Sequence, residues 1–365
     1  NFAQHGSYCG LAYRLGSGAV MNDMNKNAHA KPDFDNVEFA IFMGTSPAQS
    51  GNPFKRQGRL LANARTKSAE EFSYAVVAPN MPITNTAATQ NNTWVPILPG
   101  TDSAMAMAMI RYIIDNQRYN ETYLRAPGRA GMEAAGEVGC SNATHLVITE
   151  ENHPLYGKFL REIDITGEGE ERNASPILVK SSDTLSLEGA DTARVGELFV
   201  EERVTLANGE SVSVESSFSL LAKSARKLTL EEYSQECGVP VKTIEGLARR
   251  FTSHGRKAAV ITHGGMMSGN GFYNAWSIMA LNVMIGNMNH KGGMLVNGGK
   301  FAEYAPGPRY NMVDFEGKVA PKGMMLARAK KPYETSTEFK LKKERGENPY
   351  PADRPWYPFA GGQSS

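Results

Sequence analysis

The sequence contains few cysteines. Three occur in 365 residues, at positions 9, 140 and 237. Their separation is too wide for the paired cysteines of zinc and iron–sulfur sites, so this chain is not expected to build a metal cluster from its own cysteines. An odd number neither requires nor excludes a disulfide, and the redox compartment therefore stays open.

The sequence also lacks a long apolar run and an excess of either charge. The longest apolar run, residues 275–285, is interrupted by Asn282 and falls short of the roughly 20 residues that span a bilayer. The 39 basic and 38 acidic side chains nearly cancel, and no stretch suggests a nucleic-acid groove or a membrane-surface helix. We therefore expect neither nucleic-acid binding nor direct membrane insertion.

The two ends of the sequence indicate an internal piece of a longer protein. The chain begins with Asn1 rather than Met, without a signal peptide or twin-arginine leader, and ends in the polar residues 361–365. With 365 residues it exceeds the roughly 250 to 300 residues of a single core, so more than one lobe is expected.

The first part of the chain alternates short buried strands with helices. The predicted strands are residues 37–43, 72–77 and 94–97, and the predicted helices are residues 53–64 and 103–115. Pro96 favours an edge position for the third strand, and Thr101 or Asp102 can cap the second helix. Strand, helix, strand predicts an α/β fold with a doubly wound, Rossmann-like parallel sheet.

The later part of the chain predicts small strands and then a second α/β unit. Residues 119–195 read as peripheral loops and short strands, and residues 195–214 as a hairpin that turns at Asn208 and Gly209. Further helices are predicted to begin near residues 228 and 240, followed by a strand at 257–262 and a helix at 270–285. We place boundaries to give domains at 1–235 and 236–300 and an extended arm at 301–365.

Four loops follow predicted strands, where a doubly wound sheet binds its ligands. They contain Gly44, Thr45 and Ser46; Ala78, Pro79 and Asn80; Pro99, Gly100, Thr101 and Asp102; and His263, Gly264 and Gly265. None carries the G-x-G-x-x-G fingerprint or a P-loop lysine. The residues alone therefore indicate only a nucleotide-like ligand.

The order of these segments resembles the dimethyl-sulfoxide-reductase superfamily of molybdenum enzymes. The resemblance rests on a cysteine near a helix start, on "VPILPGTDSAMAMAMIRYI" and on "NAWSIMALNVMIGNMNHKGGML". Within that superfamily, "HGSYCGLAYRLG", "GTSPAQSGNPFKRQ" and "NPYPADRPWYP" are most similar to the tetrathionate reductase catalytic subunits. The resemblance covers nearly the whole chain and implies that residues 1–235 bind a molybdopterin guanine dinucleotide and that 236–300 are half of a split α/β domain.

The resemblance implies a metal ligand and a set of cofactor contacts. Cys9 would bind molybdenum as a thiolate beside the sulfurs of two pterins, although a lone cysteine is more commonly a buried free thiol. Asp102, with Thr101, would accept hydrogen bonds from the guanine, the alternative being a helix cap. The amides after Gly44 would approach the cofactor, the alternative being a tight turn.

The resemblance implies roles for other residues too, and each of these residues also has a simpler structural explanation. His263 would lie near the second pterin and hydrogen-bond it or protonate product, although a lone histidine is more often structural. Arg14 would attract an anionic substrate, and a surface salt bridge is equally compatible. Ala78, Pro79 and Asn80 stand where related enzymes often carry Asp-Pro-Arg, so the usual acidic contact is missing. Asn80 would replace part of that contact, the alternative being that the nucleotide end is held differently. Cys140 and Cys237 are predicted to be buried free thiols, and the methionines to fill the core.

The resemblance finally implies an activity and its setting. The expected reaction is two-electron reduction of tetrathionate to thiosulfate in anaerobic respiration, at molybdenum held by bis(molybdopterin guanine dinucleotide). A [4Fe-4S] cluster is expected before residue 1, and this fragment alone is expected to be inactive. The implied partners, in the periplasm, are an electron-transfer subunit with iron–sulfur clusters and a quinol-oxidising subunit in the membrane. The alternatives are arsenate, thiosulfate or polysulfide reduction, or a non-catalytic nucleotide-binding module.

Overall fold

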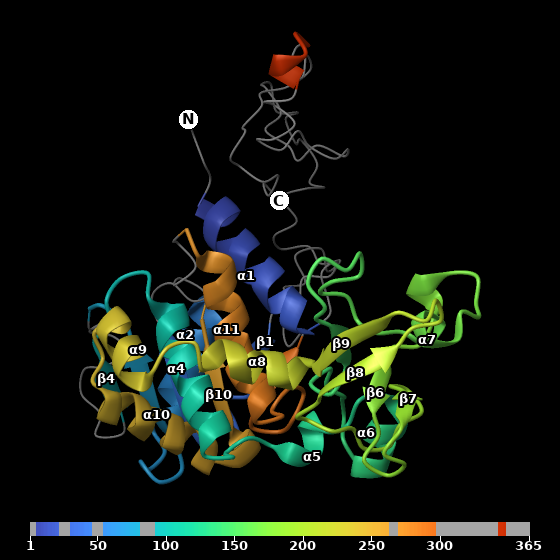
Figure 1. Ribbon diagram of the computed structural model, residues 1–365. Coiled ribbons are helices and arrows are strands. Elements are labelled where there is room, and N and C mark those ends of the chain that lie inside the picture. Colours follow the sequence, from blue (N-terminus) through green and yellow to red (C-terminus); the bar gives the residue numbers. More distant parts are fainter. Residues whose placement is uncertain are drawn as a thin grey trace, which may run out of the picture.

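The computed structural model describes residues 5–21, 30–45, 54–80, 92–262, 269–296 and 342–347 (Figure 1). At residues 5–9, 11, 54–57 and 296 the description is limited to the backbone. The structural statements below concern these residues.

A four-stranded parallel sheet forms the centre of the chain. The strand order is β10 (Ala258–Ile261), β2 (Phe39–Met43), β3 (Ser73–Val77) and β4 (Asn92–Val95). β10, β2 and β3 are buried along their whole length, whereas two of the four residues of β4 are exposed. The four predicted strands are therefore confirmed, and so is the edge position of β4, which ends directly before Pro96.

Helices cover both faces of this sheet, as the α/β prediction requires. The helices are α2 (Phe54–Ala64), α4 (Asp102–Asp115), α10 (Val241–Ser253) and α11 (Gly271–Met284). Ile41 and Val77 share one apolar cluster with α4, α10 and α11, and the alternate residues Phe42 and Val76 share the other with Leu61 of α2.

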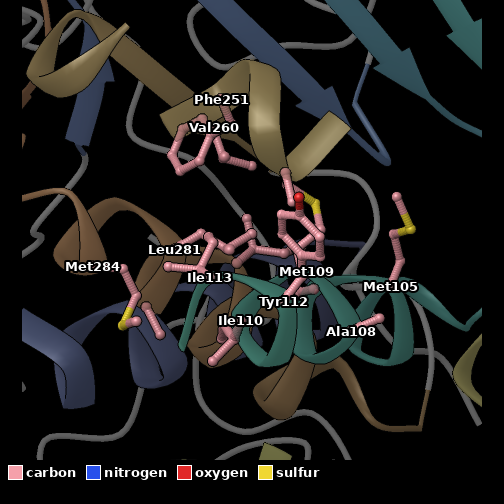
Figure 2. Close-up of a cluster of buried hydrophobic side chains, with 14 of the residues drawn as sticks. Met105, Ala108, Met109, Ile110, Tyr112, Ile113, Phe251, Val260, Leu281 and Met284 are labelled. Atoms are coloured by element: carbon pink, nitrogen blue, oxygen red, sulfur yellow. The ribbon is translucent and has the colours of Figure 1, made fainter. Parts of the chain in front are cut away.

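The methionines of α4 belong to the first of these clusters. Met105 and Met109 are fully buried, and Figure 2 shows Met109 and Ile113 gathered beside Leu281 of α11. Their role as core filling is confirmed.

The outer edge of β10 is closed by side chains instead of another strand. Asn282 of α11 accepts a hydrogen bond from Val260 N–H and donates one to Val260 C=O, both at 2.9 Å. Asn287 donates to Ala258 C=O at 2.6 Å and to Asn282 Oδ1 at 2.9 Å. These two asparagines of the "LNVMIGN" segment thus pair with backbone groups that an adjacent strand would otherwise satisfy.

Residues 136–216 form what we call the antiparallel insertion. It contains a three-stranded sheet in the order β5 (Leu146–Ile148), β9 (Ser211–Ser216), β8 (Glu201–Thr205), and the pair β6 (Leu178–Lys180) and β7 (Leu187–Gly189). The helical segments in and beside it are α5 (Glu121–Leu124), α6 (Arg129–Ala135), α7 (Glu162–Thr166) and a 3-10 turn at Arg172–Ala174. It has its own apolar cluster around Leu146, Leu160 and Val212, and the hairpin predicted within 195–214 is confirmed.

The remaining elements connect these parts. α8 (Ser217–Ala225) and α9 (Leu230–Cys237) return the chain from the insertion, and a 3-10 turn at Gly255–Lys257 precedes β10. α1 (His5–Met21) packs along α11, and β1 (Ala30–Pro32) pairs with β11 (Met294–Val296). Because β10 pairs with β2, the sheet crosses the boundary placed near residue 235. The division into domains itself stays a prediction.

Candidate functional site

The candidate site lies at the carboxyl-terminal edge of the parallel sheet. Since β2, β3, β4 and β10 run in one direction, their last residues meet at the same edge. The predicted residues at this edge are Gly44, Thr45, Asn80, Pro99, Gly100, Thr101 and Asp102. Ser46, His263, Gly264 and Gly265 lie outside the described residues.

Gly44 makes a tight turn at the end of β2. Its φ of +60° is the left-handed conformation that glycine adopts most easily, and its amide donates to Val77 C=O at 2.9 Å. That amide is therefore used within the sheet, while Thr45 after it is buried. Gly44 itself therefore forms the tight turn that was the alternative to a cofactor contact.

The start of α4 is held by hydrogen bonds within its own loop. Gly100 has a φ of +81°, and the Thr101 hydroxyl donates to Leu98 C=O at 2.7 Å. Thr101 or Asp102 was predicted to cap the helix; Thr101 occupies the N-cap position without a side-chain cap, so that prediction is wrong for Thr101. The physical reason is that its hydroxyl points back to the preceding turn.

Asp102 is a buried acceptor at this edge. Asp102 is 5% exposed, and this burial raises the pKa of its carboxyl from 3.8 to about 6. Among the described residues no ion pair is made to Asp102, so this carboxylate has capacity for further donors.

Two asparagines at the start of α11, the N-cap residue Asn270 and Asn274, also contact this loop, and the sequence analysis missed them. Asn270 donates to Gly100 C=O at 3.1 Å, and Asn274 Oδ1 accepts from Ser103 N–H at 3.1 Å. Asn274 is fully buried. The available signal was the spacing of two asparagines four residues apart at a predicted helix start, directly after a glycine-rich loop.

Thr262 and Asn80 complete the described edge. Thr262, directly after β10, is 3% exposed, and its hydroxyl is buried with no hydrogen-bond partner. Asn80 is exposed at the end of the β3 loop. Thr262 was not among the predicted site residues, because the predicted binding loop begins one residue later, at His263.

Cys9 and Arg14 lie on α1. Cys9 is in the second turn of this helix, and its side chain lies outside the described residues. Gly16 meets the first turn of α11, where a Cβ would lie 2.5 Å from Phe272 C=O. The Cys9 backbone is therefore about 10 Å along the α1 axis from that contact.

Arg14 presents a buried, unpaired donor. Its Nε atom is buried and has no hydrogen-bond partner. The surface salt bridge considered for it is not present among the described ion pairs.

The described residues contain no alternative metal centre. No group of three or more His, Cys, Asp or Glu side chains is placed to hold a metal ion, within the ranges given above. Cys140 and Cys237 are both free thiols, as predicted. Cys237 is buried as expected, whereas Cys140 is exposed, so the prediction of burial is wrong for Cys140. No helix in the described part of the chain is long and apolar enough to cross a membrane.

The family comparison follows the same order of segments. Residues 1–343 match the family model described as Molybdopterin oxidoreductase. The chain therefore belongs to the molybdopterin oxidoreductase family.

Comparison with individual relatives shows which members of the family the chain is similar to. The chain is 55% identical to a tetrathionate reductase subunit of Salmonella typhimurium, over 100% of the chain and 35% of the relative. It is 34% identical to a selenate reductase subunit of Mesobacillus selenatarsenatis, over 91% of the chain and 30% of that protein. It is 30% identical to a tetrathionate reductase subunit of Archaeoglobus fulgidus, over 100% of the chain and 30% of the relative. The chain thus spans about a third of the length of these relatives.

Proposed function

We propose that this chain is part of the catalytic subunit of a molybdenum-dependent oxidoreductase that reduces tetrathionate. The observation that carries the proposal is the 55% identity to the Salmonella tetrathionate reductase subunit along the whole chain. The edge of the parallel sheet supplies the supporting geometry.

The described edge fits the nucleotide end of a molybdopterin guanine dinucleotide. Guanine presents adjacent N–H donors, and the ionised, buried Asp102 carboxylate is an acceptor without an ion-pair partner among the described residues. Thr262 adds a buried hydroxyl whose hydrogen-bonding capacity is unused. Both features are costly in an empty protein and are relieved by a polar ligand.

Two residues of α1 would serve the metal and the substrate. A thiolate at Cys9 suits a soft redox metal, and the α1 backbone carries this residue beyond the contact with α11. The Arg14 guanidinium has a donor without a partner and would attract the tetrathionate dianion. His263, if near the second pterin, would donate a hydrogen bond to it.

The reaction balances without an added proton. Two electrons enter the central S–S bond of tetrathionate, this bond breaks, and two thiosulfate ions leave. When bound, the molybdenum cofactor supplies these two electrons at the substrate sulfur. The chain's own contribution is to hold the cofactor, to attract the dianion and to keep water from the site.

The electrons would arrive from outside this chain. We propose a [4Fe-4S] cluster in a segment that precedes residue 1, an electron-transfer subunit with iron–sulfur clusters, and a quinol-oxidising subunit in the membrane. We place the assembly in the periplasm, in anaerobic respiration. These proposals follow from the family resemblance alone.

A second candidate function is reduction of another oxyanion at the same site. The 34% identity to a selenate reductase subunit favours selenate specifically. Arsenate and thiosulfate remain in the same test.

The test uses the full-length protein, produced anaerobically with its cofactor maturation machinery. Oxidation of a reduced viologen dye is followed with tetrathionate, selenate, arsenate and thiosulfate, for the wild type, Cys9→Ala and the matched control Cys140→Ala. We expect tetrathionate turnover in the wild type and Cys140→Ala and its loss in Cys9→Ala. A preference for selenate would mean that selenate, and not tetrathionate, is the substrate. A protein with neither molybdenum nor turnover would contradict the proposal.

A further inference from the structure

Two helices begin side by side at the candidate site. α4 and α11 pack against each other, and their first residues lie next to the same loop, residues 99–103. The amides at a helix start usually lack partners and bind anions. The partners of these amides therefore indicate whether the sheet edge can bind a phosphate or another part of a ligand.

At the start of α4 the amides of Thr101 and Ser103 are already engaged. Thr101 N–H donates to Leu98 C=O at 3.3 Å, and Met105 N–H to Thr101 C=O at 3.2 Å. Ser103 N–H donates to Asn274 Oδ1 at 3.1 Å. Beside these engaged amides the helix start presents a buried acceptor, the Asp102 carboxylate.

Asn270 and Asn274 hold the loop on both sides of Asp102. They lie one helical turn apart and so face the same direction. Asn274 accepts from the amide after Asp102, whereas Asn270 donates to Gly100 C=O at 3.1 Å and to Ser103 Oγ at 3.4 Å. Because Asn274 is fully buried, its amide group retains a fixed direction only while such bonds are made.

We propose that Asn274 is a positioning residue for cofactor binding: by accepting the Ser103 amide, it directs the Asp102 carboxylate toward a guanine edge. Asn270 supports the same arrangement from the opposite side of Asp102. The inference rests on the proposed function, since it concerns how this chain holds the guanine nucleotide of that cofactor.

The acceptor role predicts a specific pattern among variants. Asn274→Leu has a similar size and no acceptor, whereas Asn274→Asp keeps an oxygen for Ser103 N–H. Ser277→Ala is the matched control, because the Ser277 hydroxyl is buried on the same helix and donates only to Tyr273 and Asn274 carbonyls. It changes α11 without touching α4.

The experiment measures guanine nucleotide retained by the anaerobically purified full-length protein after buffer exchange. Nucleotide is released with acid and quantified, and molybdenum is measured in parallel. We expect Asn274→Leu to lose nucleotide roughly tenfold faster than the wild type, as removal of one buried acceptor predicts. Ser277→Ala should stay within about twofold of the wild type. Asn274→Asp keeps the acceptor but buries a charge near Asp102, so it should lose nucleotide faster than the wild type and more slowly than Asn274→Leu.

Other outcomes would overturn the inference separately from the proposed function. Wild-type retention in Asn274→Leu would contradict it, and so would equal losses in Asn274→Leu and Asn274→Asp. If Asn274→Leu does not fold, Asn270→Ala replaces it; this half-buried residue should give roughly threefold faster loss, and an unchanged rate would contradict the inference. A wild-type protein without guanine nucleotide would instead contradict the proposed function.

Discussion

The parallel sheet and the antiparallel insertion are stabilised in different ways. In the sheet, buried asparagines bond directly to backbone groups, as Asn282 does to both polar groups of Val260. In the insertion, charged side chains pair near the surface, as Arg203 does with Glu150 at 3.0 Å. Residues 136–216 carry sixteen acidic and six basic side chains, so charge is concentrated there.

This difference separates the parts of the chain that tolerate change from those that do not. A buried polar group that loses its partner receives no compensation from water and destabilises the fold by about 1 to 3 kcal/mol. An exposed ion pair contributes about 0 to 1 kcal/mol. The candidate site is therefore built on the part of the chain where single polar contacts matter most.

The largest effect is expected at Asn282. Asn282→Leu keeps the side-chain size and leaves the buried N–H and C=O of Val260 unpaired, so the free energy of unfolding should fall by about 4 kcal/mol. Hydrogen exchange of β10 and α11 in the full-length protein measures it. Arg203→Ala in the insertion is the comparison and should cost less than about 1 kcal/mol. Equal losses in the two variants would remove the distinction between the sheet and the insertion.

The next effect is expected where the two regions join. Arg256, before β10, donates two hydrogen bonds to the Glu137 carboxylate at the start of the insertion, one at 2.6 Å. The Glu137 side chain is only 4% exposed. Arg256→Ala leaves a buried carboxylate without its cation and should cost about 3 kcal/mol.

Hydrogen exchange of residues 129–140 reports this loss locally. Glu137→Gln is the matched control, because it removes the buried charge and leaves the partly exposed Arg256 free to contact water. Its cost should be smaller than that of Arg256→Ala. If Arg256→Ala lowered the free energy of unfolding less than Glu137→Gln, the contact between the sheet and the insertion would not depend on the Arg256–Glu137 pair.

Sequence patterns predicted the elements of the sheet well and the contacts around them poorly. Continuous apolar runs such as residues 39–43 and 258–261 identify buried strands because both faces are covered. Asn282 interrupts an apolar helix, and nothing local shows that it bonds to a strand 22 residues earlier. The concentration of acidic side chains in the insertion was also overlooked, because the whole chain is nearly neutral.

The candidate site shows the same limit. The loops after the strands were predicted because parallel strands end at one edge, and seven predicted residues lie there. Thr101 was expected to cap α4, but its hydroxyl contacts Leu98 C=O. Asn274 contacts a residue 171 positions earlier, and no sequence period reports such a pairing. Cys9 and His263 stay predictions from the resemblance.

The smallest of the three effects has the opposite sign and occurs at Asp102. Burial raises the pKa of this carboxyl from 3.8 to about 6. Between these two pH values the folded chain holds a proton that the unfolded chain has released, so stability falls as the pH rises and the penalty is complete above about pH 6. Asp102→Asn has no charge and should stabilise the cofactor-free protein by about 2 kcal/mol at about pH 8, and by almost nothing at about pH 4.

The same substitution should weaken cofactor retention, because an amide offers guanine one acceptor oxygen where the carboxylate offers two. Hydrogen exchange of α4 in the cofactor-free full-length protein, at both pH values, measures the stability, and acid-released guanine nucleotide measures retention. Asp115→Asn at the other end of α4 is the control: this carboxylate pairs with Arg226 near the surface, so its loss gives no gain at either pH. A variant that is both more stable and less able to hold nucleotide would identify Asp102 as a charge kept in the sheet edge for binding; a gain in stability with unchanged retention would leave its burial without a functional reason.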